Sequence, residues 1–418
     1  MATSTLEEIV AELIGESGKL RCYQQKLLWT PFWQVKHVVL ETPASDRFLM
    51  YVVPERRLNP GEDYVNLQYI ADLAGFYNAR YFFEVARYES FKFPIGQFDF
   101  FTKPLVVGSK DFTVFVSKLH KNRHLEGPVA DSDGHPRSKH YRKLTISIEE
   151  AYIVADKLAY LHQQSLHLAN DDEVRTIVQE NYSLVAELIS AKLVDNINNY
   201  LADTLEDNGK FFTSPDACFE KILFLYKSFP KLSEAYPATT ELPLVLAHGN
   251  LTAEKLIFTP KKDDLQLIEH WEMVHFGSAA EDLAHLITTS LSVTDRRSNY
   301  LKILRKYYYA LRDKRAVRFK LEHLKDFYLK YLKFSVFLSF PTLAAVLKSK
   351  AYTDIEKQAA VDRFEAVLED AYQVETGSYD SDGEDLLTAQ NTEHRHVAGI
   401  VAKSRRSFEP CLSPIFSE

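Results

Sequence analysis

The residues from 246 to 258 combine groups that could hold a substrate with groups that could not catalyse its reaction. The segment reads Leu-Ala-His-Gly-Asn-Leu-Thr-Ala-Glu-Lys-Leu-Ile-Phe. The amide of Asn250 can hold a hydroxyl group, but it cannot take the proton of that group. The ammonium of Lys255 has no lone pair to give to a metal ion, and its charge repels the ion. The segment therefore predicts a polar loop that lacks a general base.

A second polar segment follows closely, and it could form a site together with the first. His270 and Glu272 lie there, and a neutral histidine nitrogen suits zinc, copper or iron better than magnesium. If the segment is a strand, alternation places these two side chains on one face, and a zinc site is one interpretation, although no third ligand is evident. The interpretation that we favour is an ion pair of Lys255 with Glu269 or Glu272, in which the ammonium takes the place of a metal cation.

The order of these motifs resembles the small-molecule kinases of the choline and aminoglycoside type, and most of all their ecdysteroid-kinase-like (CHK kinase-like) branch. In that family the first segment is His-Gly-Asp followed five residues later by Asn, and the second is an apolar strand that ends in Asp. The resemblance implies a catalytic-base aspartate and two magnesium ligands, and the matching positions hold Asn250, Lys255 and His270. It also implies that His248 braces the loop and that Asp282 binds the loop or caps a helix.

The amino-terminal part of the resemblance has lost its chemical residues as well. In the family, a strand lysine grips the phosphates of the nucleotide, and a glutamate on the next helix orients that lysine. The matching positions are Tyr51 and Glu84. The turn at 41–47 has no glycine, although backbone amides that cover phosphates need one for close approach. We therefore expect no resident ATP or magnesium.

Trp271 and Glu272 match an aromatic residue and a Gln or Glu that follow the metal aspartate in the family. In choline-type kinases, aromatic and acidic residues near this position bind a cationic acceptor, as cation–π attraction allows. Two interpretations stay open, because Trp271 could line a ligand pocket or could be part of the core.

The function favoured by these residues is that of a catalytically impaired kinase-like protein, a pseudokinase that acts by binding a small ligand or another protein. The alternative is an active ATP- and magnesium-dependent phosphotransferase that acts on a small hydroxyl-bearing molecule of choline, sterol or aminoglycoside type. Such an enzyme would need relocated carboxylates, and the nearby acids are Glu254, Glu269, Glu272 and Asp282. The directions of these carboxylates distinguish the two functions.

The pattern of strands followed by helices predicts the elements that position these residues. It indicates a bilobal, protein-kinase-like α+β fold, with a small antiparallel-sheet lobe and a mostly helical large lobe. The expected parts are an amino-terminal helix at 1–19, the sheet lobe at 20–120, the helical lobe at 121–376 and a disordered acidic and polar tail at 377–418.

Within the sheet lobe, the patterns predict strands at 32–41, 47–53, 95–107 and 111–118, and two helices at 62–75 and 77–91. In the helical lobe, a hairpin is expected at 255–269. Ser147 stands three residues before Glu150, which is typical of a capping box that opens a helix.

The bulk composition excludes several classes of protein. The 418 residues carry a net charge of −8 without a large basic block, so we expect no nucleic-acid partner. Three scattered cysteines favour a reducing compartment, and we expect the protein in the cytoplasm, with the nucleus as an alternative. No uncharged stretch reaches the roughly 20 residues of a membrane span, and the amino terminus does not resemble a signal peptide.

Overall fold

The computed structural model divides the chain into two compact units, residues 1–375 and 376–418, and the fold described here is that of the first. The expected helix at 1–19, most of the loop at 120–143 and nearly all of the tail lie outside the described residues. The structure describes residues 21–25, 32, 36–41, 47–92, 100–107, 110–119, 143–193, 197–227, 242–259, 261–314 and 318–379.

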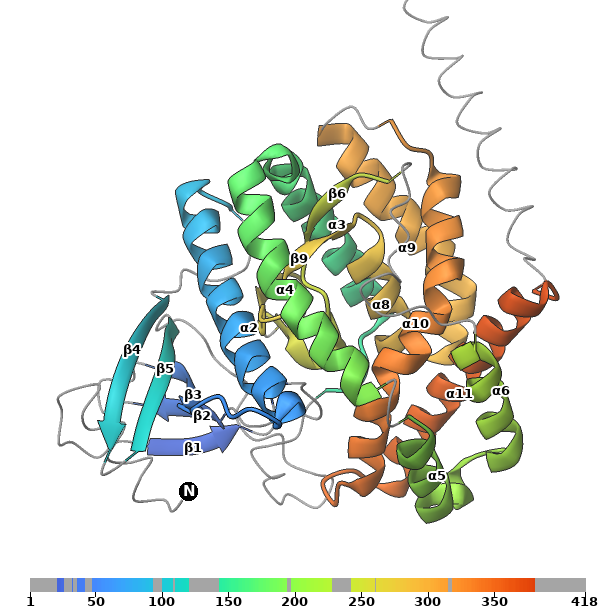
Figure 1. Ribbon diagram of the computed structural model, residues 1–418. Helices are drawn as coiled ribbons and strands as arrows, with labels where there is room; N and C mark the ends of the chain where they lie inside the picture. The colour runs from blue at the N-terminus through green and yellow to red at the C-terminus, as the bar shows by residue number, and fades with distance from the viewer. Residues whose placement is uncertain are drawn as a thin grey trace, which may run out of the picture. The chain divides into compact units, whose positions relative to one another are not determined.

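A five-stranded antiparallel sheet forms the small lobe, with the strand order β1-β2-β3-β5-β4 (Figure 1). The central strand β3 carries Tyr51, which lies opposite His37 of β2 and Phe115 of β5. One helix, α2, connects β3 to β4 and lies beside the sheet. The strands are β1 (Arg21–Gln25), β2 (Lys36–Glu41), β3 (Arg47–Pro54), β4 (Phe100–Val107) and β5 (Lys110–Leu119).

Helix α2 is a single helix, Asp63–Tyr88, and the prediction of two helices at 62–75 and 77–91 is wrong. The boundary between the two predicted ranges lies beside Gly75, and glycine weakens a helix. In the structure this glycine lies inside the helix and allows close packing. A Cβ at position 75 would lie 2.7 Å from the ring of Phe32.

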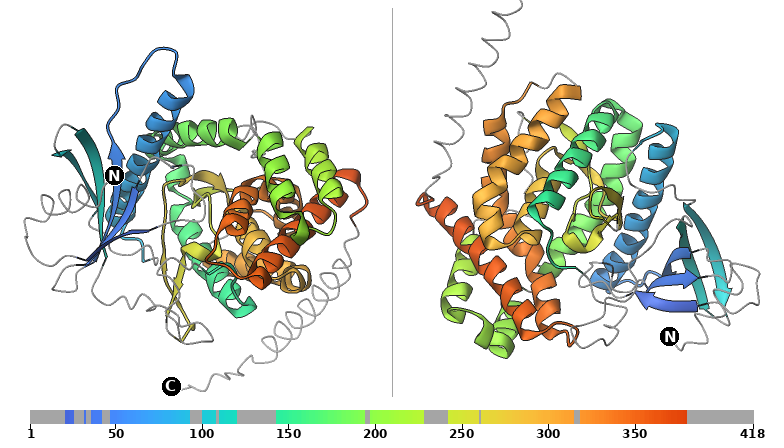
Figure 2. Two further views of the ribbon diagram at one scale, coloured as in Figure 1. Left: turned by 90° about the horizontal axis from the view of Figure 1, so that it is seen from below. Right: turned by 180° about the vertical axis from the view of Figure 1, so that it is seen from behind.

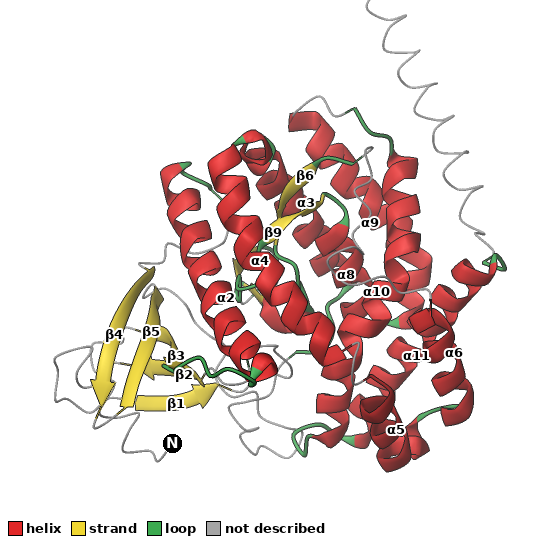
Figure 3. Ribbon diagram, viewed as in Figure 1, coloured by secondary structure: helices red, strands yellow, loops and turns green. Residues whose placement is uncertain are grey.

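The large lobe is mostly helical and contains two short strand pairs (Figure 3). Strand β6 (Leu244–Ala247) pairs with β9 (His275–Ser278), and β7 (Leu256–Phe258) pairs with β8 (Leu265–Ile268), so the hairpin predicted at 255–269 is confirmed. The helices are α3 (Ile148–Ser165), α4 (Asp172–Leu193), α5 (Ile197–Asn208), α6 (Pro215–Lys227), α8 (Glu281–Ser290), α9 (Val293–Lys314), α10 (Leu321–Lys348) and α11 (Asp354–Thr376).

The start of α3 has the capping box that the sequence predicts. The side chain of Ser147 accepts a hydrogen bond from the backbone N–H of Glu150 at 3.2 Å, and the Glu150 carboxylate accepts one from the N–H of Ser147 at 2.7 Å. Lys143 donates to the same carboxylate at 2.6 Å. These contacts satisfy helix N–H groups that would otherwise lack partners.

Two hydrophobic clusters hold the unit together. The larger one lies within the large lobe and also takes in residues of α2. The smaller one, here called the interlobe cluster, joins the sheet and α2 to α4 and α10, which Figure 2 shows from two further sides. Its buried members are Phe32, Tyr51, Val53, Phe76, Phe115, Tyr182, Val185, Ala186, Ile189, Met273 and Leu338. Sheet lobe and helical lobe together form the kinase-like α+β architecture expected from the sequence.

Helix α10 is the one described helix with the length and apolar content of a membrane span. Of its most apolar 18-residue window, 67% is buried inside the protein. This burial comes from contacts with neighbouring helices, chiefly α8 and α9.

Candidate functional site

The loop after β6 is held by a network of buried polar contacts. Asp282, at the start of α8, accepts hydrogen bonds from the backbone N–H groups of His248 at 2.6 Å and Gly249 at 3.0 Å. Nε2 of His248 lies 2.9 Å from the carbonyl oxygen of Glu269, and its Nδ1 accepts from the N–H of Asn250 at 3.2 Å. His248 therefore braces both polar segments and has no ring nitrogen left for a substrate.

The electrostatics of the network fix the charges of its members. Burial and, to a smaller extent, the nearby Lys255 ammonium lower the pKa of His248 to about 4, so the imidazole is neutral. Burial alone would raise the pKa of Asp282, but His162 and His248 beside it outweigh that effect and hold the pKa below its usual value. Asp282 is thus a buried carboxylate with structural partners.

The side chain of Lys255 turns inward. The residue is 3% exposed, and its Nζ donates to the carbonyl oxygen of Asn250 at 2.5 Å. The backbone N–H of Glu269 donates to the carbonyl oxygen of Lys255 at 2.9 Å, so the two polar segments meet here. An ammonium at this position does not fit magnesium, which requires oxygen ligands.

His270 follows β8 in a backbone conformation that is rare for a residue with a side chain, with φ of 68°. Its Nδ1 lies 3.3 Å from Oε1 of Glu272, and its ring meets the edge of Tyr51 at 6.3 Å between centroids. His270 and Glu272 converge because of this turn and not because of strand alternation. Within the described residues, no three His, Cys, Asp or Glu side chains are placed to hold a metal ion, so the zinc interpretation gains no third ligand.

Tyr51, which the family resemblance matches to the phosphate-gripping lysine, is buried in the interlobe cluster. Its ring packs on Phe76 of α2, with 4.5 Å between the centroids. Glu84, the expected helix partner, lies eight residues further along α2 than Phe76, or about 12 Å along the helix axis. The side chain of Glu84 is 53% exposed and forms an ion pair with Arg80 at 2.8 Å. The placement of Glu84 opposite position 51 is therefore wrong, because Phe76 fills that place.

Trp271 lies in the core. It is 1% exposed, it stacks on Phe82 with 4.4 Å between ring centroids, and its Nε1 donates to the carbonyl oxygen of Ile268 at 2.9 Å. Glu272 next to it is buried too. The structure thus places Trp271 where it supports the fold of the second segment, with almost no surface for a ligand.

Two further buried residues belong to the site, His275 and Glu281. His275 of β9 stacks on Tyr182 with 3.8 Å between centroids, and its Nε2 lies 3.1 Å from Oε1 of Glu281. Burial would lower the pKa of His275, but the Glu281 carboxylate outweighs it, and the pKa is raised. The only signal in the sequence was a histidine between apolar residues, which is typical of many cores.

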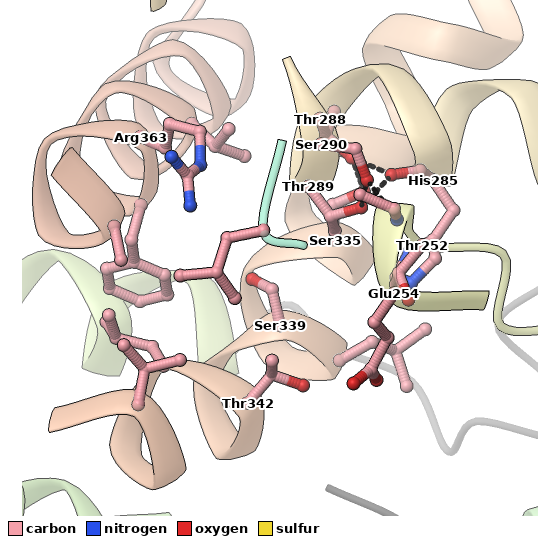
Figure 4. A pocket seen from close by; sticks show the side chains of 18 of the residues that line it. Thr252, Glu254, His285, Thr288, Thr289, Ser290, Ser335, Ser339, Thr342 and Arg363 are labelled. Atoms are coloured by element: carbon pink, nitrogen blue, oxygen red, sulfur yellow. Dashed lines mark hydrogen bonds between the residues drawn. The ribbon is translucent and has the colours of Figure 1, made fainter. Parts of the chain in front are cut away.

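A cavity of about 670 Å³, open solvent at its mouth included, lies beside the same loop (Figure 4). Its wall includes Thr252 and Glu254, but not Asn250, Lys255 or His270. The other walls come from the segment 143–144 and from α8, α10 and α11. Three hydroxyl-bearing residues of α10, which follow one another at helical spacing, line it: Ser335, Ser339 and Thr342.

A family model matches residues 133–377, which is more than half of the chain. The model is DUF1679, described as "Uncharacterized oxidoreductase dhs-27". The chain belongs to this family. No curated protein matches the sequence. The matched range of this DUF1679 member contains both polar segments and the residues that line the cavity.

Solved structures similar to this DUF1679 member are phosphotransferases and kinases by name. A macrolide 2'-phosphotransferase type I has 12% identity and a TM-score of 0.40, with 91% of this chain and 99% of that chain covered. The amicoumacin kinase hAmiN, in complex with AMP-PNP, Ca²⁺ and Ami, has 10% identity and a TM-score of 0.45, with 88% and 94% covered. A Plasmodium vivax ethanolamine kinase has 11% identity and a TM-score of 0.40, with 83% and 81% covered.

The sequence lacks the glycine fingerprint that many dinucleotide-dependent oxidoreductases use. A dinucleotide-binding turn uses Gly-x-Gly-x-x-Gly between a strand and a helix of a parallel sheet. The 14 glycines of this chain include no Gly-x-Gly, and the described strands pair in antiparallel fashion.

Proposed function

We propose that this protein is a catalytically impaired relative of the small-molecule kinases, and that it acts by binding a small molecule. The observation that carries the proposal is the contact of Lys255 with the carbonyl oxygen of Asn250. At the two positions where the resemblance implies a general base and a metal ligand, the chain has an amide and an internal cation.

The phosphate side of the nucleotide site supports the same proposal. Tyr51 brings no positive charge to phosphates, and its ring is packed among the apolar side chains of the interlobe cluster. A nucleotide would therefore have to displace buried apolar groups and would lose a cationic partner. Removing one preorganised electrostatic contact costs about 10²–10³-fold in rate, and here several are absent together, although such losses do not add.

The cavity supports a binding function. It lies on the loop that carries Asn250 and Lys255, and its walls combine apolar side chains with a few polar groups, as small-molecule sites do. A protein of this kind would keep the acceptor side of the kinase site and lose the nucleotide side.

Titration calorimetry of the purified protein with ATP, with and without magnesium, tests the proposal. We expect no magnesium-dependent ATP binding, and no phosphate transfer to choline-like, sterol or aminoglycoside acceptors. Magnesium-dependent binding with turnover, lost in Glu254→Gln, Glu269→Gln or Glu272→Gln, would contradict the proposal and show a kinase with relocated carboxylates.

A further inference from the structure

We infer that the cavity binds a small organic anion, whose carboxylate or phosphate group pairs with Arg363 and whose apolar body lies between α10 and α11. The inference rests on the proposed function, because it names the kind of ligand that the same cavity would hold. Figure 4 shows Arg363 and Glu254 on opposite sides of the cavity.

Arg363 is a cation without a counter-ion within the part of the chain that the structure describes. The residue is half-buried in α11, and no hydrogen bond or ion pair joins its guanidinium to a described residue. The neighbouring Asp362 acts on it only through space. Burial lowers the pKa of Arg363 to about 10, so the group still carries its charge at neutral pH, but at a cost that an anion would relieve.

Two other arginines, Arg296 and Arg297, have a carboxylate partner in the structure. Asp370, on the same helix as Arg363, accepts from Arg296 at 2.6 Å and from Arg297 at 2.8 Å. The buried Arg296 therefore has a carboxylate of its own. Arg363 faces a cavity where the protein offers none within ion-pair distance among its described residues.

The other titratable groups of the cavity wall do not replace Arg363 as the anion partner. Lys143 is already paired with Glu150 at 2.6 Å. Burial and the nearby Lys255 lower the pKa of His285 to about 3, so that imidazole is neutral. Glu254 is the acid of the cavity wall, and it would repel an anion from the opposite side. An anionic group is therefore directed to the end of the cavity near Arg363.

The rest of the wall defines the body of the ligand. Leu343 and Val346 of α10 and Phe364 and Val367 of α11 give it an apolar surface. The hydroxyl of Thr252 is buried and has no hydrogen-bond partner among the described residues, so the far end of the ligand can bear a hydroxyl or amino group. These features fit a small amphipathic acid or phosphate ester.

Four probes with a chain of eight carbons distinguish the effect of the head group from that of the apolar body: octanoate, octyl phosphate, 1-octanol and octyltrimethylammonium. We would titrate each into the full-length protein by calorimetry, below its micelle concentration. We expect octanoate and octyl phosphate to bind at least 10-fold more tightly than 1-octanol, and octyltrimethylammonium to bind most weakly. The ratio between the two anions tells whether the natural head group is a carboxylate or a phosphate.

Two variants locate the binding. Arg363→Gln removes one charge-assisted contact and should weaken both anions about 10- to 100-fold while it leaves 1-octanol unchanged. Arg312→Gln, an exposed arginine of α9, is the matched control and should change nothing. Ser339→Trp fills the cavity and should abolish binding of every probe, with circular dichroism melts to show that each variant is folded.

The outcomes distinguish the two levels of the inference. If the four probes bind alike and Arg363→Gln has no effect, but Ser339→Trp abolishes binding, the cavity holds ligands and the choice of an anion is overturned. If no probe binds, or if folded Ser339→Trp binds them unchanged, the cavity is not the ligand site, and the proposed function loses its support.

Discussion

Gly249 sets the shape of the loop that carries Asn250 and Lys255. Its φ is +80°, and a Cβ there would lie 2.3 Å from the carbonyl oxygen of Met273 and 3.0 Å from Nδ1 of His275. Glycine adopts this backbone conformation without a steric penalty, whereas other residues lose about 1–2 kcal/mol. The loop therefore approaches the second polar segment more closely than any side chain would permit.

Two glycine-to-alanine variants distinguish the cost of backbone strain from the cost of a steric clash. Gly249→Ala should lower the free energy of unfolding by about 2–5 kcal/mol, because the backbone strain is joined by overpacking against Met273. Gly61→Ala is the matched control, since its φ is +85° but no atom lies within 4 Å of the added Cβ, and it should cost about 1–2 kcal/mol. Urea unfolding measures both. Equal losses would mean that the loop shifts freely and that the close approach is unimportant.

Helix α3 supports the elements of the site. Its first turn allows a test at the scale of an element. Ser147→Ala removes one half of the capping box and should destabilise the protein by about 1 kcal/mol in chemical denaturation. Ser183→Ala, on α4, is the control, because that exposed hydroxyl bonds only a carbonyl of its own helix and should cost little. A loss in Ser147→Ala no larger than in the control would show that Lys143 and Glu150 hold the helix start unaided.

The elements that the sequence predicts correctly have local signals. The hairpin of β7 and β8 and the capping box of α3 follow from apolar periodicity and turn residues. Strand β1 was missed, because Arg-Cys-Tyr-Gln-Gln shows no alternation and pairs only through β2. The pairing of β6 with β9 joins residues about thirty apart, and no local pattern records it.

Some features of the candidate site could be predicted from the sequence, and others could not. The closeness of Asn250 and Lys255 follows from motif spacing, and so does the position of Asp282 beside the loop. The helix residue opposite Tyr51 does not, because motif matching cannot fix the rotation of a helix, and Phe76 stands where Glu84 was expected. The cavity could not be predicted at all, since its wall combines segments from residue 143 to residue 367.

For the whole molecule, buried neutral histidines make stability depend on pH. The pKa of His248 is about 4 and that of His285 about 3, both mainly through burial, whereas an unfolded histidine titrates near 6.5. Below about pH 6.5 these two histidines bind protons in the unfolded chain but stay neutral in the folded protein. The free energy of unfolding therefore falls as pH falls. His275 acts in the opposite sense, because its raised pKa contributes stability that is lost as pH rises through the folded value. Two groups against one leave a net loss in acid.

We therefore expect the free energy of unfolding to fall between pH 6.5 and pH 5, by about 2 kcal/mol for each of the two neutral histidines before the contribution of His275 is subtracted. Urea unfolding at several pH values measures the slope. His285→Gln should make the slope shallower, because it removes one of the two neutral imidazoles. A flat profile in the unaltered protein would contradict the assignment of neutral buried imidazoles.

The inward-facing Lys255 has a last consequence. A metal ion arrives and departs with its concentration, whereas a side chain is covalently tied to the chain and is present from the moment of folding. The ammonium of Lys255 lies on the carbonyl oxygen of Asn250 and is held there by the chain itself. Under the proposed function, the loop is held without magnesium or a nucleotide, and a ligand of the neighbouring cavity is a molecule that can act on it. The loop would then respond to a ligand of the cavity and not to the concentration of magnesium.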